Sequence, residues 1–230
     1  MQQVQTSTVS VPRVNDRGTM DSFFVMPDGE GPVPGLIVIH EIFGLNDNIR
    51  GIAKQFAQQG YAALAVDLFS HRNRTLCMMQ LIHGMMIRPL SNGVVADLKS
   101  AIAFLQAQPG VDANRIGAVG FCMGGGYALQ LAVTDKGMKA ASAFYGAAPR
   151  PLEAFVESCP IIGSYPEKDF TVKGARELDA ALEKYNIPHD IKFYENTQHS
   201  FFNQQRTPFE VEASKDAWQR MLSFFREHLR

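Results

Sequence analysis

The sequence predicts an α/β fold in which a mostly parallel central sheet carries helices on both faces. Continuous apolar runs at residues 35–40, 61–66 and 116–119 are typical of strands that are buried on both faces, as in parallel sheets. Helical patterns separate these runs, and that alternation is typical of βαβ units. A chain of 230 residues can bury one large core, so we expect a single domain over residues 1–230.

The N-terminal part is expected to begin with a hairpin and then to enter the sheet. Residues 6–11 alternate between polar and apolar side chains and residues 20–26 do so in part, with an Asn-Asp-Arg-Gly turn between them. After the strand at residues 35–40, helical spacing over residues 48–59 stops at a glycine. The strand at residues 61–66 then completes the first βαβ unit.

The second half repeats this alternation of helix and strand. Residues 97–108 carry apolar side chains at helical spacing and end at Pro-Gly, and the strand at residues 116–119 follows. The same reasoning predicts three later strands, at residues 140–145, 160–164 and 189–194. It also predicts helices at residues 124–132, 172–185 and 211–230, the last with an apolar stripe.

The composition excludes several kinds of partner. A net charge of −1, from 22 basic and 23 acidic residues, argues against a nucleic-acid surface. There is no apolar run long enough to cross a membrane and no secretion signal at the start, so we expect a cytoplasmic protein without a membrane partner. The three cysteines, Cys77, Cys122 and Cys159, are odd in number and lack CxxC spacing, so neither a disulfide framework nor a metal site is expected.

The most informative motif is Gly-Phe-Cys-Met-Gly at residues 120–124, directly after a predicted buried strand and before a Gly-rich helix. The middle residue, Cys122, must turn this corner, and the flanking glycines remove Cβ atoms that would collide. A helix N-terminus favours a thiolate, and the Met123 N–H points where an oxyanion would form. Cys122 is therefore predicted to be a nucleophile at a nucleophile elbow; the alternative is a small buried apolar residue.

A thiol at such a corner needs a base within reach and an acid that orients the base, in the chain order nucleophile, acid, histidine. Asp169 follows one predicted strand and His199 follows the last one. Each has another interpretation, because Asp169 could cap the next helix, Glu167 could be the acid, and His199 could be a solvated loop residue. Because three such coincidences at separate loops are improbable, we predict a catalytic triad of Cys122, Asp169 and His199.

The loop after the strand at residues 35–40 is expected to supply the second oxyanion donor, for which we choose the Ile42 N–H. Glu41 would then lie close to Cys122, where its charge would oppose thiolate formation. We hypothesise that a neutral thiol bonded to Glu41 resists oxidation until substrate displaces the carboxylate and His199 takes the proton. The alternative is that Glu41 only holds the loop.

With these residues assembled, the chain resembles the dienelactone hydrolase family of α/β-hydrolases. The matching segments lie between residue 35 and the C-terminal helix, at residues 40–45, 66–69, 120–125, 167–169 and 199–201. The resemblance implies the α/β-hydrolase fold, the Cys122, His199 and Asp169 triad, an oxyanion hole from Ile42 and Met123, and Glu41 as the resting partner of the cysteine. It also implies hydrolysis of lactone or ester bonds without a metal or an organic cofactor.

The residues that would bind a substrate carboxylate depart from the family pattern. Family members that act on dienelactones carry one arginine after the segment that matches residues 67–69 and another shortly after the histidine. Here these places hold His71 and Asn203. A guanidinium can reach far and bind a carboxylate bidentately, so a shift of register could bring in another arginine. Four candidates are Arg72, Arg74, Arg88 and Arg206.

Residues 70–93 interrupt the βαβ rhythm, because they are rich in methionine and arginine and have no clear period. They could form a cap or lid over the active site, or an ordinary surface helix with loops. The function that we expect is hydrolysis of a small lactone or ester, as in carboxymethylenebutenolidase, by a monomer or small homo-oligomer. The rivals are a general carboxylesterase or thioesterase, a noncatalytic ligand-binding protein, and a thiol redox enzyme.

Overall fold

The central element of the structure is one twisted sheet. The computed structural model describes residues 2–14, 18–29, 31–71, 73–206 and 210–230. Within them the strands are β1 (Val4–Pro12), β2 (Thr19–Pro27), β3 (Val33–Ile39), β4 (Ala62–Val66), β5 (Val111–Phe121), β6 (Ala140–Phe144), β7 (Ile161–Pro166) and β8 (His189–Tyr194). The helices are α1 (Asp47–Gln58), α2 (Arg74–Ile87), α3 (Gly93–Gln106), α4 (Met123–Thr134), α5 (Val172–Lys184) and α6 (Val211–His228), with a short 3₁₀ helix η2 (Leu152–Glu157).

The strand order is β1-β2-β4-β3-β5-β6-β7-β8. β1 pairs with β2 and β2 pairs with β4 in antiparallel fashion, whereas the neighbours from β4 to β8 are all parallel. The predicted hairpin and the mostly parallel sheet are therefore confirmed. All the connections between parallel strands bring the strand C-termini to the same edge of the sheet, and loops from that edge form the candidate site.

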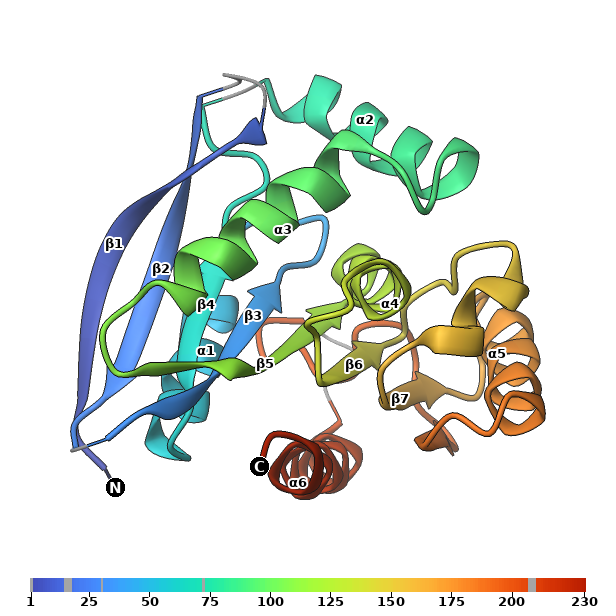
Figure 1. Cartoon of the computed structure of the whole chain (residues 1–230). Helices are drawn as coiled ribbons and strands as arrows, with labels where there is room; N and C mark the ends of the chain where they lie inside the picture. The colour runs from blue at the N-terminus through green and yellow to red at the C-terminus, as the bar shows by residue number, and fades with distance from the viewer. Residues whose placement is uncertain (1, 15–17, 30, 72, 207–209) are drawn as a thin grey trace.

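Helices cover both faces of the sheet, as predicted (Figure 1). Leu36 and Val38 of β3 point to the face that α1 and α6 cover, with Phe56 and Phe225 in the same core cluster. Ile37 of the same strand points to the opposite face of the sheet, where apolar residues of α3 and α4 pack. Successive side chains of a strand alternate between the faces, so a strand buried on both sides must be apolar throughout.

The segment at residues 70–93 contains the helix α2. Its N-cap Asn73 accepts hydrogen bonds from Thr75 and Leu76. One face of α2 is buried through Cys77 and Leu81. The other face exposes apolar residues, which are Leu76, Met79, Ile82 and Ile87. Because both faces are apolar, the sequence shows no amphipathic period there. A role of this segment as a lid stays a prediction.

Two element boundaries and one element differ from the expectation. α3 begins at Gly93, earlier than predicted, because the side chain of Asn92 accepts hydrogen bonds from the Val94 and Val95 backbones. β5 begins at Val111, before the apolar run. The 3₁₀ helix η2 was not predicted, since it is short and, within the described chain, Phe155 is its one buried residue, with no helical apolar period around it.

Candidate active site

Cys122 lies at the corner between β5 and α4. Its backbone has φ 55° and ψ −117°, a left-handed conformation that side chains rarely adopt. Its N–H donates to the Phe144 carbonyl at 3.0 Å, which ties the corner to the end of β6. The side chain is half-buried. The corner therefore presents the sulfur at the C-terminal edge of the sheet, beside the start of a helix.

Glycines allow the strand and the helix to approach closely around this corner. A Cβ atom on Gly120 would lie 1.9 Å from the Gly124 carbonyl oxygen, and one on Gly124 would lie 2.3 Å from the Ile39 carbonyl oxygen. Both distances are far below any allowed contact, and the neighbouring atoms belong to the backbone and cannot rotate away. The packing of α4 against β3 and β5 therefore requires glycine at both positions.

His199 is oriented by a buried carboxylate. Its Nδ1 lies 2.7 Å from Asp169 Oδ2, and the Thr171 hydroxyl donates to the same oxygen at 2.9 Å. The Asp169 side chain is 1% exposed. Burial raises the pKa of Asp169, but the hydrogen bonds from His199 and Thr171 outweigh it and lower that pKa overall. An ionised carboxylate can only accept, so Nδ1 carries the proton and Nε2 is the nitrogen left for the substrate side.

The second polar neighbour of His199 is Cys122. Burial of the ring lowers the pKa of His199, but hydrogen bonds to Asp169 and Cys122 and the charges of both groups outweigh it and raise the pKa to about 9. The structure thus brings together all three residues of the predicted triad. The imidazolium form of His199 is therefore favoured at neutral pH.

Two aromatic rings enclose the imidazole. Phe170 stacks on it with ring centroids 4.9 Å apart, although Phe170 itself is 80% exposed. Tyr145 lies on another side, also at 4.9 Å, and its hydroxyl is buried without a hydrogen-bond partner among the described residues. Burial, and then the negative charges of Glu41 and Cys122, raise the pKa of Tyr145 well above its ordinary value, so its phenol stays protonated.

The loop after β3 forms a tight turn. The Gly44 N–H donates to the Glu41 carbonyl at 3.1 Å, which closes the turn, and Ile42 lies at its second position. The Ile42 N–H is not needed for this turn bond, and the Ile42 side chain is 38% exposed. Arg74, the first residue of α2, donates to the Ile42 carbonyl at 2.9 Å. The predicted oxyanion donor therefore lies in a rigid turn that α2 also contacts.

Glu41 is bonded to the loop that carries His199. The Ser200 hydroxyl donates to Glu41 Oε1 at 2.7 Å, and the Asn203 amide donates to Glu41 Oε2. Glu41 is 2% exposed. In this conformation the carboxylate joins the two loops, and its role as the resting partner of Cys122 stays a prediction. Sequence reasoning did not find Ser200, although its place directly after His199 was a signal.

The residues proposed for a substrate carboxylate are divided between two places. His71 is largely exposed, with Nε2 3.1 Å from Asp21 Oδ1 of β2. Asn203 is buried and holds Glu41, so its amide belongs to the scaffold. Arg206 lies over the ring of Phe43, at 4.6 Å, in the turn of residues 41–44. Arg72 lies outside the described residues.

The other two candidate arginines also lie in two different parts of the structure. Arg74 contacts the oxyanion turn and lies over the Phe69 ring at 5.3 Å. Arg88 instead lines a cavity of about 1100 Å³ between α2 and α3, whose lining includes none of Cys122, Asp169 and His199. The structure therefore brings Arg74 and Arg206, and not Arg88, to the turn of residues 41–44. Among the described residues there is no cluster of acidic, cysteine and histidine side chains suited to a metal ion.

Comparison with known proteins identifies the family. A sequence model described as the dienelactone hydrolase family matches residues 20–229. The chain belongs to the dienelactone hydrolase family. It is therefore an enzyme, a hydrolase with the α/β-hydrolase fold, as the resemblance implied. No helix in the described ranges is long and apolar enough to cross a membrane.

Relatives of this dienelactone hydrolase family member cover almost its full length. A Saccharolobus solfataricus protein named "Putative carboxymethylenebutenolidase" is 33% identical over 249 residues, which cover 92% of this chain and 95% of that protein. A structure described as "Putative Dienelactone Hydrolase" from Klebsiella pneumoniae subsp. pneumoniae superposes with a TM-score of 0.83 at 29% identity, and covers 97% of this chain and 98% of that one. The dienelactone hydrolase-like promiscuous phosphotriesterase P91, with a TM-score of 0.84 at 22% identity over 99% of both chains, shows the common fold.

Proposed function

We propose that this protein hydrolyses lactone or carboxylic ester bonds through a thioester formed on Cys122. The observation that carries this proposal is the position of His199, which bonds to the buried Asp169 and whose pKa the neighbouring Cys122 side chain raises. A nucleophile, a base and an orienting acid in this order are the machinery of acyl transfer. The family membership supports the same chemistry.

In the first half of the cycle, the Cys122 sulfur attacks the carbonyl carbon and the C=O electron pair moves onto oxygen. The Ile42 and Met123 N–H groups stabilise that oxyanion. The oxyanion then collapses, the bond between carbonyl carbon and ester oxygen breaks, and His199 gives its proton to the departing oxygen. A lactone opens to a tethered alcohol, whereas an ester releases a separate alcohol.

In the second half, His199 takes a proton from water and the resulting hydroxide attacks the thioester carbonyl. The same two amides hold the second oxyanion, and its collapse breaks the C–S bond. The carboxylic acid leaves, and the sulfur returns to its pairing with His199. Asp169 stays ionised throughout and fixes the imidazole in the tautomer that faces the sulfur.

We further propose that the preferred substrates carry a carboxylate, as a carboxymethylene-substituted butenolide does. Arg74 and Arg206 both contact the turn that holds Ile42, since Arg74 donates to the Ile42 carbonyl and Arg206 lies over the Phe43 ring. A guanidinium at such a place suits an anionic ligand. Small neutral esters are the alternative, and they need neither arginine.

The alternative function, that of a thiol redox enzyme, is not favoured because Cys122 has no suitable resolving cysteine among the described residues. Such an enzyme needs a resolving cysteine whose thiolate can attack. Cys77 lies on the buried face of α2, which closes it to an attacking partner. Burial raises the pKa of the Cys159 thiol to about 12, so Cys159 does not readily form a thiolate at neutral pH.

A substrate panel tests the proposal. Wild type should hydrolyse both a dienelactone and p-nitrophenyl acetate, and Cys122→Ala should hydrolyse neither. Arg74→Met keeps the apolar stem on Phe69 and should raise KM for the dienelactone at least about tenfold while leaving the neutral ester within about threefold. The control Arg226→Met, on the exposed face of α6, should change neither. Activity that survives in Cys122→Ala would contradict the thioester cycle, and equal effects of Arg74→Met on both substrates would contradict carboxylate binding.

A further inference from the structure

A buried histidine holds the peptide unit between Glu41 and Ile42 from its carbonyl side. His40 Nδ1 lies 2.6 Å from the Glu41 carbonyl oxygen, and the Gly44 N–H donates to the same oxygen. In a trans peptide the C=O and the N–H point in opposite directions. Two bonds that fix the direction of the Glu41 carbonyl therefore also fix the direction of the Ile42 N–H.

The second ring nitrogen decides the tautomer of His40. The Leu68 N–H donates to His40 Nε2 at 3.1 Å, and a backbone N–H can only donate. Nε2 must therefore accept, the proton lies on Nδ1, and Nδ1 donates to Glu41. The ring is fully buried. Burial lowers the pKa of His40 and outweighs the opposing effects of the Glu41 carbonyl and the Asp67 charge; Arg74 lowers it further.

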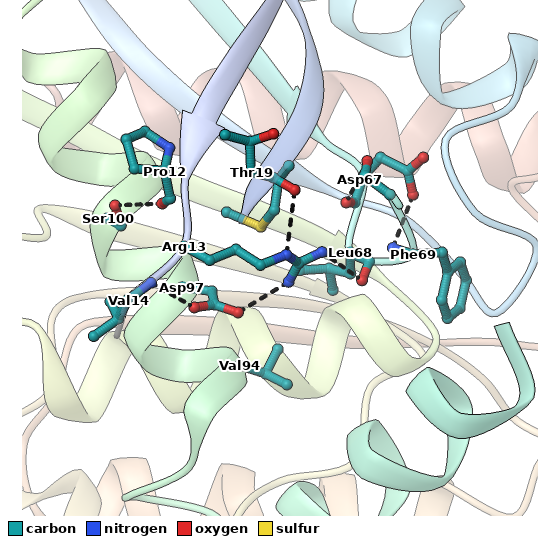
Figure 2. A network of polar contacts seen from close by, with 12 residues as sticks. Pro12, Arg13, Val14, Thr19, Asp67, Leu68, Phe69, Val94, Asp97 and Ser100 are labelled. Carbon is teal, nitrogen blue, oxygen red and sulfur yellow. Dashed lines mark hydrogen bonds and ion pairs between the residues drawn. The ribbon is translucent and has the colours of Figure 1, made fainter. Parts of the chain in front are cut away.

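A buried ion pair holds the loop that fixes His40. Arg13 Nη2 donates to the Leu68 carbonyl at 3.1 Å, and its Nη1 lies 2.9 Å from Asp97 Oδ2. Figure 2 shows how Arg13 extends from the end of β1 and lies between Asp97, Thr19 and Leu68. The side chains of Arg13 and Asp97 are 3% and 2% exposed. Leu68 therefore presents its N–H from a loop with a fixed position.

We propose that His40 is a positioning residue of the oxyanion hole, whose Nδ1–H aims the Ile42 N–H at the oxygen that gains charge during the reaction. This rests on the proposed function, since it has meaning only if Ile42 supplies an oxyanion donor. The other donor is held in the same manner. The Cys122 carbonyl belongs to the same peptide unit as the Met123 N–H, and it accepts from the Gly126 N–H at 3.2 Å. This hydrogen bond within the helix fixes the direction of the Met123 N–H, just as the His40 hydrogen bond fixes the direction of the Ile42 N–H.

Two variants of His40 separate positioning from simple packing. In His40→Asn the amide nitrogen replaces Nδ1, so the donor to Glu41 remains and the acceptor for Leu68 is lost. In His40→Gln the amide lies at the place of Nε2, so the contact with Leu68 remains and the donor to Glu41 is lost. Each variant removes one hydrogen bond from the same buried site, so a packing role predicts similar effects for both.

Two reactions of Cys122 provide the readouts. Acylation by p-nitrophenyl acetate forms an oxyanion, whereas alkylation by iodoacetamide displaces iodide and forms none. His40→Gln should acylate roughly 100-fold more slowly than wild type, the loss typical of one oxyanion donor, with alkylation within about threefold. His40→Asn should acylate within about tenfold of wild type. Equal acylation rates in the two variants, or a parallel fall of acylation and alkylation in His40→Gln, would overturn the inference.

A measurement on the unaltered protein does not depend on the folding of the variants. Nitrogen NMR of protein with labelled histidine should show His40 neutral, with its proton on Nδ1, from pH 6 to 9. A proton on Nε2, or a charged ring at pH 6 and above, would also overturn the inference. Failure of the proposed function looks different, because wild type would then hydrolyse no ester or lactone, whatever the tautomer of His40.

Discussion

His199 lies between two partners that both favour its protonated form. Its pKa is raised to about 9, even though burial of the ring acts in the opposite direction. A group whose pKa is higher in the folded than in the unfolded protein stabilises the fold most where it is protonated in both states. The interactions of His199 with Asp169 and Cys122 therefore contribute to the free energy of unfolding, and this contribution depends on pH.

The pH dependence of stability should reveal this pair. The His199 contribution is complete below the unfolded pKa of about 6.5 and is lost as pH rises through about 9. The difference in free energy of unfolding between wild type and His199→Gln should therefore shrink from pH 6 to pH 10. Urea denaturation at several pH values measures it. A difference that stays constant or grows with pH would show that His199 is not protonated in the folded state.

Asp169→Asn should separate orientation from proton transfer. Asparagine keeps the size of Asp169 but can donate to Nδ1, which favours the wrong tautomer of His199, and kcat should fall by roughly 10²- to 10⁴-fold with little change in KM. Thr171→Val is the matched control, because it removes only the second donor to Asp169 and should cost less than about tenfold. Steady-state kinetics with p-nitrophenyl acetate measures both. A small effect of Asp169→Asn would remove Asp169 from the catalytic group.

At the scale of single residues, the sequence identified side chains whose chemistry depends on a motif. Cys122, Asp169 and His199 could be predicted because each follows a strand in a recognisable order. Ser200 and Tyr145 could not, because their importance comes from contacts with Glu41 and His199 that only the folded loops create. His40 looked like the end of a buried strand, and nothing in its local pattern shows that its ring bonds to Glu41 and Leu68.

At the scale of elements, the corner at Cys122 depends on the close approach of α4 to the sheet. Gly124→Ala should prevent the native corner, because its Cβ would meet the Ile39 carbonyl oxygen at 2.3 Å. Gly51→Ala is the control, since a Cβ there meets no atom within 4 Å and glycine is unfavourable inside a helix such as α1. We expect Gly51→Ala to stabilise the protein by up to about 1 kcal/mol.

Thermal denaturation and ester hydrolysis together check this pair of variants. Gly124→Ala should lose hydrolysis and unfold at a markedly lower temperature, whereas Gly51→Ala should keep full activity. Native stability and activity in Gly124→Ala would show that α4 lies further from β3 than the structure has it.

Elements with one dominant periodicity were predictable, and the others were not. The buried strands β3 and β4 are apolar throughout because both faces are covered, so the sequence alone identified them. The start of α3 depends on the side chain of Asn92, which no apolar pattern reveals. The helix α2 has apolar residues on both its buried and its exposed faces, and this removes the signal on which helix prediction depends.

At the scale of the whole molecule, one buried ion pair joins three distant parts of the chain. Arg13 comes from the end of β1, Asp97 from α3, and the Leu68 carbonyl from the loop after β4. The sequence predicted the hairpin and α3, but not this contact between them, because no local pattern pairs charges 84 positions apart. The antiparallel hairpin is therefore attached to the parallel part by polar contacts as well as by strand pairing.

Removal of one partner of this pair should destabilise the protein strongly. Arg13→Met removes the Arg13 side of this buried ion pair, and breaking a buried pair at one partner typically costs about 3–5 kcal/mol. The double variant Arg13→Met with Asp97→Leu leaves no uncompensated charge and should recover part of this loss. Urea denaturation of the wild type, the two single variants and the double variant completes the cycle. Additive losses would show that the two side chains do not interact energetically.

The left-handed corner at residue 122 has a consequence for how such a protein would evolve. Only glycine adopts this backbone conformation without strain, yet glycine cannot act as a nucleophile. Under the proposed function, mutation of Cys122 to glycine would therefore relax the backbone and abolish hydrolysis in a single step. In a lineage released from selection for hydrolysis, this position should be among the first to change. The descendants should then be more stable proteins that lack enzymatic activity.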